Sequence, residues 1–301
     1  MKKLMKTAMA GFALSISASV GAAAAQDTAP ADPVEIHEDG WRLIAPENLM
    51  LIETAKDTVV IELNSSFAPN HAERMRELAA SGEYEGEHFY RVIEGFVAQG
   101  GLFDDMQILR WGPLKNENDR PYGGEGFVPL GNADLFAPEV GHIGGFPVRR
   151  DEALGQEWLL HCPGAVALAR NNDPDSGGTE IYIVLDAQRY LDRNLTVFGR
   201  VIDGMEHVQA FQRGDRAIEN GVIQAPETGE EILKLTIASD LPEDERPVWR
   251  TMTSDGQPFA DHKTALRVRE GDFFYRKPPE VLDICGFNTP AEPVVAAATA
   301  D

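Results

Sequence analysis

The chain has 301 residues, 49 acidic against 27 basic side chains, and a formal net charge of −22. This length suffices for one large domain or two modest ones. Nucleic acids and anionic membrane surfaces are bound by clustered lysine and arginine, so the acidic composition argues against both as partners. Neutral and polypeptide ligands remain compatible with the composition.

The first 25 residues have the pattern of a cleavable export signal. Three lysines stand among the first six residues, residues 7–20 form an apolar run too short to span a bilayer, and residues 23–25 are alanines before Gln26. No later segment is long and apolar enough for a membrane span. We therefore expect an exported protein, periplasmic in a bacterium, with no membrane insertion after signal cleavage.

Two apolar runs predict a β-hairpin, and a helix follows them. Leu49–Glu53 and Thr58–Leu63 are rich in β-forming residues and are separated by four residues. From Pro69 to Ala80, apolar residues recur at helical spacing, and Pro69 suits the first turn of a helix. Ser81-Gly82 is expected to end this helix.

A charged residue then stands in apolar surroundings. Arg91 has Val92 and Phe96 among its neighbours, Gln99 follows eight residues later, and Gly100-Gly101 closes the run. A guanidinium among apolar side chains is costly unless something pairs with it. We interpret Arg91 as placed for a ligand, and the alternative is a structural ion pair.

Residues 102–161 contain many glycines and prolines and few periodic segments. This composition predicts an elaborated surface insertion that packs on the body of the protein and is not a second core. Regular patterns resume at Gly164. They predict strands at Ala165–Ala169, Glu180–Leu185, Thr196–Ile202 and Leu233–Ile237, and a helix from Met205 to Phe211.

After Asp240 the composition becomes Pro-rich and acidic, a helical pattern covers Phe259–Arg269, and the end is Ala/Pro-rich. The sequence thus predicts a signal peptide (1–25), a linker (26–40), a main domain (41–240) with an insertion (102–161), and a C-terminal extension (241–301) with a partly disordered tail. The aromatic cluster Phe273-Phe274-Tyr275 either packs on the barrel or recruits a partner.

The two cysteines, Cys162 and Cys285, leave two alternatives. An oxidising compartment permits a disulfide between them, but spatial distance decides whether it forms. Two buried free thiols fit the sequence equally well. His161 precedes Cys162, yet no second pair stands at zinc-site spacing, so we interpret both residues as structural.

The strand-rich pattern with two clear helices indicates a mainly β barrel or sandwich. Two motifs make the chain resemble the cyclophilin-type peptidyl-prolyl isomerases. Residues 89–101, Phe-Tyr-Arg-Val-Ile-Glu-Gly-Phe-Val-Ala-Gln-Gly-Gly, are similar to the family's central signature. Residues 164–201 resemble its second half, with Ser-Gly-Gly-Thr-Glu at 176–180, Leu191-Asp192, and Val-Phe-Gly-Arg-Val at 197–201. The resemblance covers residues 48–238. It implies a closed eight-stranded antiparallel β-barrel capped by two helices, here with a long insertion and a C-terminal extension.

The resemblance implies isomerisation of X-Pro bonds in proline-containing unfolded or extended polypeptides during periplasmic folding. The barrier to this rotation is about 18–20 kcal/mol because the C–N bond has partial double-bond character. Lowering it needs no nucleophile, metal or cofactor. A fixed donor aimed at the prolyl nitrogen removes the resonance, and a rigid guanidinium suits that task. We expect a monomer.

By the same resemblance, Arg91 is the catalytic donor, and Gln99 orients it and binds the substrate backbone. The substrate-binding residues implied are Phe96, Val97, Tyr182 and Leu191 in the proline pocket, Ala169 and the main chain of Arg170 along the extended peptide, and Glu180, Tyr190 and Leu195 at further family positions.

Four of these positions depart from the family. Glu180 replaces a glutamine, and its carboxylate could either hold Arg91 or sequester it. Leu195 replaces a frequent histidine, Tyr182 replaces a frequent phenylalanine, and Arg170 replaces a frequent asparagine, although its contact is expected through the main chain. Glu180, Leu195 and the long insertion leave an alternative function, that of a proline-peptide-binding or chaperone-like module with little or no turnover.

Overall fold

The computed structural model describes residues 39–122 and 126–294. The predicted signal peptide, nearly all of the predicted linker and the last seven residues lie outside the described residues. Within the described ranges, no helix has the length and apolar character needed to cross a membrane.

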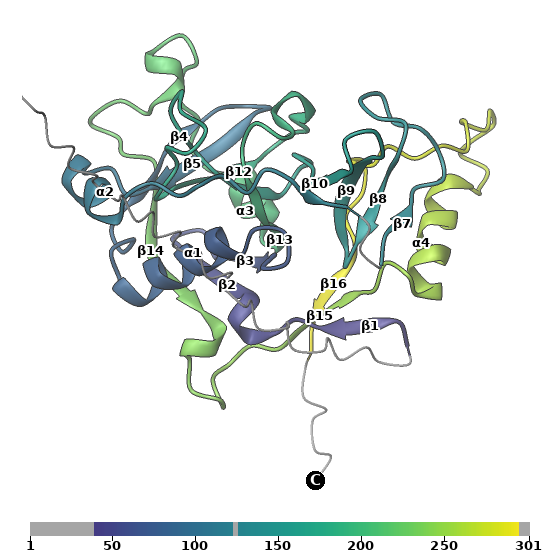
Figure 1. The fold of residues 1–301 in the computed structure, drawn as a ribbon, viewed down its shortest axis with the longest axis horizontal. Helices are drawn as coiled ribbons and strands as arrows, with labels where there is room; N and C mark the ends of the chain where they lie inside the picture. Colours follow the sequence, from purple (N-terminus) through teal and green to yellow (C-terminus); the bar gives the residue numbers. More distant parts are fainter. Residues whose placement is uncertain (1–38, 123–125, 295–301) are drawn as a thin grey trace, which may run out of the picture. The chain divides into compact units, whose positions relative to one another are not determined.

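Figure 1 shows the strands of an eight-stranded antiparallel barrel. This barrel holds the largest hydrophobic cluster of the described chain. The barrel is closed because its last strand pairs with its first. In hydrogen-bonded order the strands are β11 (Ala165–Leu168), β12 (Glu180–Val184), β5 (Val97–Gly101), β4 (His88–Val92), β14 (Glu230–Ile237), β2 (Leu49–Thr54), β3 (Thr58–Leu63) and β13 (Val197–Asp203). The predicted mainly β, closed-barrel fold is confirmed.

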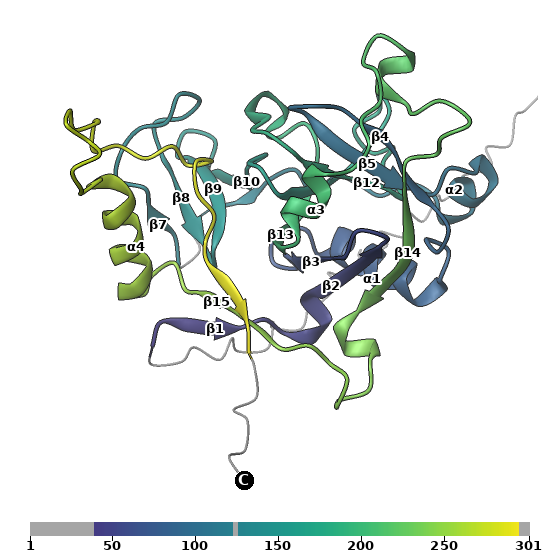
Figure 2. The same cartoon turned by 180° about the vertical axis from the view of Figure 1, so that it is seen from behind.

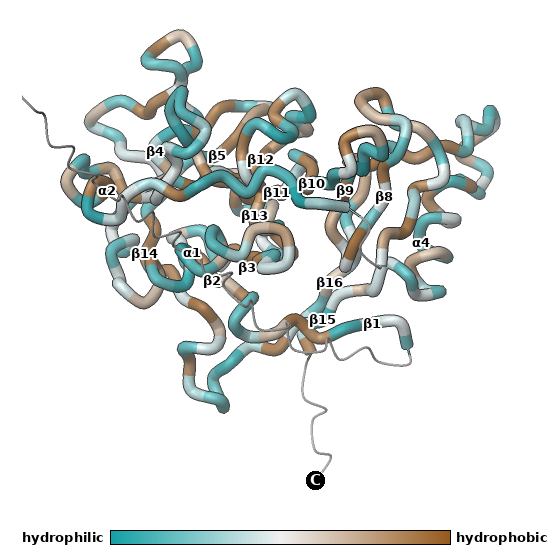
Figure 3. The backbone as a smooth tube through the Cα atoms, viewed as in Figure 1, coloured by the Kyte–Doolittle hydropathy of each residue, from teal (hydrophilic) through white to brown (hydrophobic). Residues whose placement is uncertain are grey.

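Two helices pack on the barrel, as predicted. Helix α1 (Pro69–Ser81) contacts β13 and β14, and α3 (Met205–Gln209) contacts β3. Along α1 hydrophobic and hydrophilic residues alternate (Figure 3). The helix is amphipathic, and Ala72, Met75 and Leu78 on its apolar face are buried in the core. Gly82 ends α1 in the left-handed region, with φ of 69°, which glycine adopts at little cost.

The insertion forms a sheet of its own, with short helix α2 (Asp105–Trp111) before it. Its strands, in order, are β6 (Arg120–Pro121), β10 (Gln156–Leu159), β9 (Phe146–Asp151), β8 (Val140–Ile143) and β7 (Val128–Pro129). Trp158 and Leu160 pack with Leu282 and Ile284 of the C-terminal extension in a separate hydrophobic cluster. The prediction that the insertion has no second core is therefore wrong. This second core is built from two segments that lie more than a hundred residues apart in the chain. Neither segment has a clear hydrophobic periodicity that would predict a core by itself.

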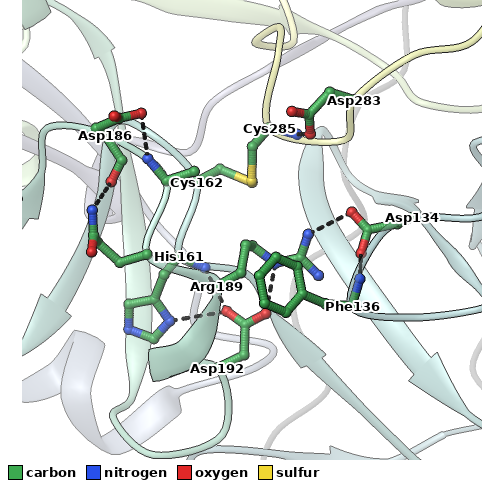
Figure 4. Close-up of a disulfide and its surroundings, with 11 residues drawn as sticks. Asp134, Phe136, His161, Cys162, Asp186, Arg189, Asp192, Asp283 and Cys285 are labelled. Carbon is green, nitrogen blue, oxygen red and sulfur yellow. Dashed lines mark hydrogen bonds and ion pairs between the residues drawn. A yellow bond between two sulfur atoms is a disulfide. The ribbon is translucent and has the colours of Figure 1, made fainter. Parts of the chain in front are cut away.

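The C-terminal extension is held to the rest of the chain by strands and by a covalent bond. Strand β15 (Trp249–Met252) pairs with β1 (Trp41–Leu43) on one side and with β16 (Ala291–Pro293) on the other, and α4 (Gln257–Arg267) follows β15. Figure 2 shows β1 and α4 near each other, with the yellow C-terminal strand running toward β1. A disulfide joins Cys162 to Cys285 across 123 residues (Figure 4), which decides between the two alternatives for the cysteines.

The structure bears on the two alternatives for the aromatic cluster Phe273-Phe274-Tyr275, packing on the barrel or recruiting a partner. The side chains of Phe273 and Tyr275 are each 87% exposed, so these two residues do not pack on the barrel. Four short 3-10 helices complete the described elements: η1 (Pro46–Asn48), η2 (Arg189–Leu191), η3 (Glu219–Gly221) and η4 (Ala238–Asp240).

Candidate active site

A groove of about 1070 Å³ lies beside the neighbouring strands β4, β5 and β12. Ten of the predicted site residues line it: Arg91, Phe96, Val97, Gln99, Ala169, Arg170, Glu180, Tyr182, Leu191 and Leu195. The exception is Tyr190, which is 64% exposed and is not part of the groove lining. The structure thus brings together residues that lie up to 104 positions apart in the chain.

Strand register explains this convergence. In the β4–β5 pair Arg91 stands opposite Gln99, and in the β5–β12 pair Gln99 stands opposite Tyr182. Directly opposed residues of antiparallel strands have neighbouring side chains. The glycines that end the motif are needed because the strands approach closely there. A side chain at Gly101 would begin 2.6 Å from the carbonyl oxygen of Thr179, and its φ is +125°.

Arg91 is held by two of its donors. Its Nη1 donates to Oε1 of Gln99 over 2.8 Å, and its Nε donates to the carbonyl of Asn220 over 2.9 Å. Its guanidinium carbon lies 5.7 Å from the centre of the Phe96 ring. Burial, together with the charge of Arg216, lowers the pKa of Arg91. Within the described part of the chain, Nη2 has no hydrogen-bond partner, so Arg91 offers a free donor at the groove.

Gln99 connects Arg91 to Glu180 through a residue that the sequence did not indicate. Its Nε2 donates to the Tyr90 hydroxyl over 2.9 Å, and that hydroxyl donates to Oε1 of Glu180. Among the described residues no ion pair joins Glu180 to Arg91, so Glu180 neither holds nor sequesters the guanidinium directly. Burial, followed by the charge of Glu180, raises the pKa of Tyr90, which keeps this phenol a donor.

Tyr90 could not be found from a strand pattern. Successive side chains in a regular strand point to opposite faces, so Tyr90 and Arg91 should not reach the same partner. The β4–β5 register shifts between His88 and Arg91, and such an irregularity breaks the alternation. Both side chains therefore bond to Gln99.

The apolar wall of the groove is supported from behind by the insertion. Phe96 and Leu195 pack on a cluster that contains Tyr182 and Val97 together with Phe146, Val148 and Leu159 of the insertion. A flat wall of carbon atoms is what an apolar ring such as that of proline requires. The insertion therefore contributes to the site without lining it at these positions.

The stretch after β11 offers main-chain groups. Ala169 donates its N–H to the carbonyl of Glu180 over 2.8 Å. The side chain of Arg170 donates to the carbonyls of Asn194 and Asn171. In the described residues the main chain of Arg170 makes no backbone hydrogen bond, so it is available to an extended peptide.

Sequence reasoning also missed the first residues of the insertion. Phe103 is 63% exposed, contacts the Tyr90 ring edge-on with centroids 5.0 Å apart, and lines the groove with Glu87, Asp104 and Asp105. The composition of residues 102–161 predicts a surface insertion, and nothing in it points toward the groove.

Comparisons with known proteins identify the family of this chain. Residues 49–235, more than half of the chain, match the model of the family described as cyclophilin type peptidyl-prolyl cis-trans isomerase/CLD. A probable peptidyl-prolyl cis-trans isomerase of Brucella suis is 29% identical over 197 residues, which cover 65% of this chain and 85% of the relative. The human peptidyl-prolyl cis-trans isomerase-like 1 is 28% identical over 170 residues, covering 56% of this chain and 80% of its own.

A solved structure is similar over most of the chain. The crystal structure of cyclophilin AquaCyp293 from Hirschia baltica has a TM-score of 0.69 and 29% identity, and the match covers 86% of this chain and 95% of that one. This share exceeds the residues that match the family model, so the likeness is not confined to residues 49–235.

Proposed function

The chain belongs to the cyclophilin-type peptidyl-prolyl cis-trans isomerase family, and on this premise we propose that the groove beside Arg91 binds and isomerises X-Pro segments of unfolded or extended polypeptides. The proposal rests on the hydrogen bonding of the Arg91 guanidinium. Gln99 and the carbonyl of Asn220 hold two of its donors, while Nη2 has no partner in the described residues.

The chemistry follows from what limits the uncatalysed reaction. The prolyl amide resists rotation because the nitrogen lone pair is delocalised into the carbonyl. A cationic donor directed at the prolyl nitrogen favours a pyramidal nitrogen, which removes that delocalisation. Because Arg91 is partly buried and held by two hydrogen bonds, it needs little reorganisation as the amide twists.

The remaining groove residues would hold the peptide. Phe96, Tyr182 and Leu191 offer apolar surface for the proline ring. The main chain of Arg170 would bond an extended peptide as a neighbouring strand does. No step needs a bound metal or cofactor, because rotation breaks no covalent bond.

The decisive experiment is an isomerisation assay on a short Ala-Pro peptide, with wild-type protein and Arg91→Ala. We expect the wild type to accelerate the reaction and the variant to lose about 100-fold or more in kcat/KM. The exposed Arg110→Ala is the matched control, since Arg110 pairs with Glu83 outside the groove. A wild type that binds the peptide without accelerating its isomerisation would support the binding-module alternative.

We further propose that the protein acts in the periplasm after export. Support comes from the lysines, apolar run and alanines of residues 1–25. Cell fractionation should place the mature protein in the periplasm, and mass spectrometry should find an N-terminus at Gln26. A cytoplasmic protein that retains Met1 would contradict export.

A further inference from the structure

A buried polar contact lies behind the Tyr182 wall of the groove. The Tyr182 hydroxyl is 2.9 Å from Nε2 of His161, and the two rings are inclined by only 15° with centroids 6.1 Å apart. His161 is 0% exposed and follows β10, so it comes from the end of the insertion. The hydroxyl of a groove residue is therefore bonded to a side chain that is not part of the groove lining.

The second ring nitrogen of His161 fixes the direction of this bond. Nδ1 lies 3.2 Å from Oδ1 of Asp192, an oxygen that also accepts from the His161 backbone N–H over 2.9 Å. A carboxylate oxygen only accepts, so Nδ1 carries a proton toward Asp192, and in the tautomer with that single ring proton Nε2 is the acceptor. In this tautomer Tyr182 donates to His161. Burial raises the pKa of Tyr182, so the phenol keeps the proton that it donates.

Asp192 is itself held in place by Arg189, as Figure 4 shows. Arg189 donates from Nε to Oδ2 of Asp192 over 2.7 Å and from Nη1 to Oδ2 of Asp134 over 2.8 Å. The Arg189 and Asp134 side chains are 4% and 6% exposed. Low exposure strengthens these bonds and makes an unpaired member costly. The chain of contacts thus runs from the insertion, through η2, to the groove.

The same contacts hold two groove residues at once. Tyr182 is held through its hydroxyl, and Leu191 lies between Arg189 and Asp192 in the sequence. Cys162, which follows His161, is bonded to Cys285 of the C-terminal extension (Figure 4). His161 is therefore fixed by its backbone, by both ring nitrogens and by its covalently tied neighbour.

We propose that His161 is a positioning residue for prolyl isomerisation, a role that rests on the proposed function of the groove. By accepting a hydrogen bond from the Tyr182 hydroxyl on the side away from the groove, His161 keeps this hydroxyl out of the groove. The groove then presents the apolar ring of Tyr182 to a proline. A buried hydroxyl without a partner is costly and would turn toward water or a peptide carbonyl in the groove. The proline ring offers no group that could satisfy it.

Four variants test this role: His161→Leu, Tyr182→Phe, the double variant of both, and His161→Gln, whose amide can still bond the hydroxyl. His142→Leu is the matched control. His142 is also a buried histidine of the insertion sheet, but within the described chain its ring nitrogens have no hydrogen-bond partner. Each variant is assayed for kcat and KM on the Ala-Pro peptide, for peptide Kd by calorimetry, and for its thermal unfolding midpoint.

We expect His161→Leu to raise KM and Kd by about threefold to tenfold, since the Tyr182 hydroxyl loses its acceptor, and Tyr182→Phe, which has no hydroxyl, is the reference for the double variant. We expect kcat to stay within about twofold, because Arg91 and Gln99 are untouched. The double variant should be no worse than the poorer single variant, because removing both polar partners leaves none unpaired. His161→Gln should recover KM to within about twofold of wild type, and His142→Leu should leave it unchanged.

Three results would overturn the proposal: a folded His161→Leu with wild-type KM and Kd, equal increases in His142→Leu, or a double variant whose KM change is the product of the single changes. If His161→Leu does not fold, His161→Met takes its place, because methionine adapts to irregular buried sites and offers no strong acceptor, and wild-type KM and Kd in folded His161→Met would overturn the role. If the wild type itself fails to accelerate isomerisation, the proposed function fails, and peptide Kd alone still tests His161.

Discussion

Gln99 accepts a 2.8 Å hydrogen bond from Nη1 of Arg91 at a point where β4 and β5 place the two residues opposite each other. A bond from a charged donor contributes about 1.5–3 kcal/mol. Because Gln99 also donates to Tyr90, its amide cannot rotate without breaking one of the two bonds. The orientation of the guanidinium is thus set by the sheet.

Gln99→Leu tests this orientation. The leucine removes the acceptor while keeping the size of the side chain, so we expect kcat/KM on an Ala-Pro peptide to fall about tenfold to 100-fold. Thermal unfolding should change little, since Gln99 is only half-buried. Gln257→Leu, at an exposed glutamine of α4, is the control. Unchanged kcat/KM in Gln99→Leu would mean that Asn220 alone orients Arg91.

Glu180→Gln asks whether the carboxylate restrains Arg91. Glu180 accepts from Tyr90 and makes no ion pair with Arg91 in the described residues, and a glutamine oxygen can accept the same bond. We therefore expect kcat/KM within about threefold of wild type. Glu180→Leu, which leaves the Tyr90 hydroxyl without an acceptor, should be more damaging. A gain of tenfold or more in Glu180→Gln would show that the negative charge holds Arg91 back.

Most strands could be predicted because their determinants are local, whereas the closed barrel and the groove residues were expected from the resemblance to the cyclophilin family. Arg91 and Gln99 stand eight residues apart in one motif, and a hairpin register is enough to bring them together. The contact between Tyr90 and Glu180 depends on the irregular β4–β5 register between His88 and Arg91, and no residue type in the sequence indicates that irregularity. The core shared by Trp158 and Leu282 needs two distant segments to meet, and no pattern in either one specifies the other.

Acid should weaken the fold through Glu62. This side chain on β3 is 3% exposed and accepts two hydrogen bonds from Arg200, and Arg42 pairs with it as well. Burial acts to raise the pKa of Glu62, but the charges of Arg42 and Arg200 outweigh burial and lower it. A carboxyl with a lowered pKa stabilises the fold above its ordinary value of 4.5, and that stability is lost as the pH falls through the folded-state pKa.

Glu62→Gln should therefore lose about 3–5 kcal/mol of unfolding free energy at pH 7, because the buried guanidinium of Arg200 and the half-buried one of Arg42 lose their counter-charge. The loss should shrink as the pH drops below 4.5. Urea unfolding from pH 7 to pH 3 measures both effects. Glu53→Gln, at an exposed position of the paired strand, is the control. A constant difference between wild type and Glu62→Gln across this range would contradict the assignment.

The disulfide should matter for the stability of the C-terminal extension. Cys162 and Cys285 close a loop of more than a hundred residues, and a disulfide typically contributes about 2–4 kcal/mol by restricting the unfolded chain, with long loops at or above the upper end. Leu282 and Ile284 also pack with Trp158 and Leu160, so we expect the extension to remain folded at low temperature when the bond is absent.

The Cys162→Ala/Cys285→Ala double variant should accordingly unfold at a lower urea concentration, and hydrogen exchange should rise first in residues 270–290. Reduction of the wild type with dithiothreitol should have the same effect, in which the reductant is oxidised as the two thiols form. The double variant treated with dithiothreitol is the control and should not change. If the oxidised and reduced wild-type proteins unfold at the same urea concentration, the hydrophobic cluster alone holds the extension in place.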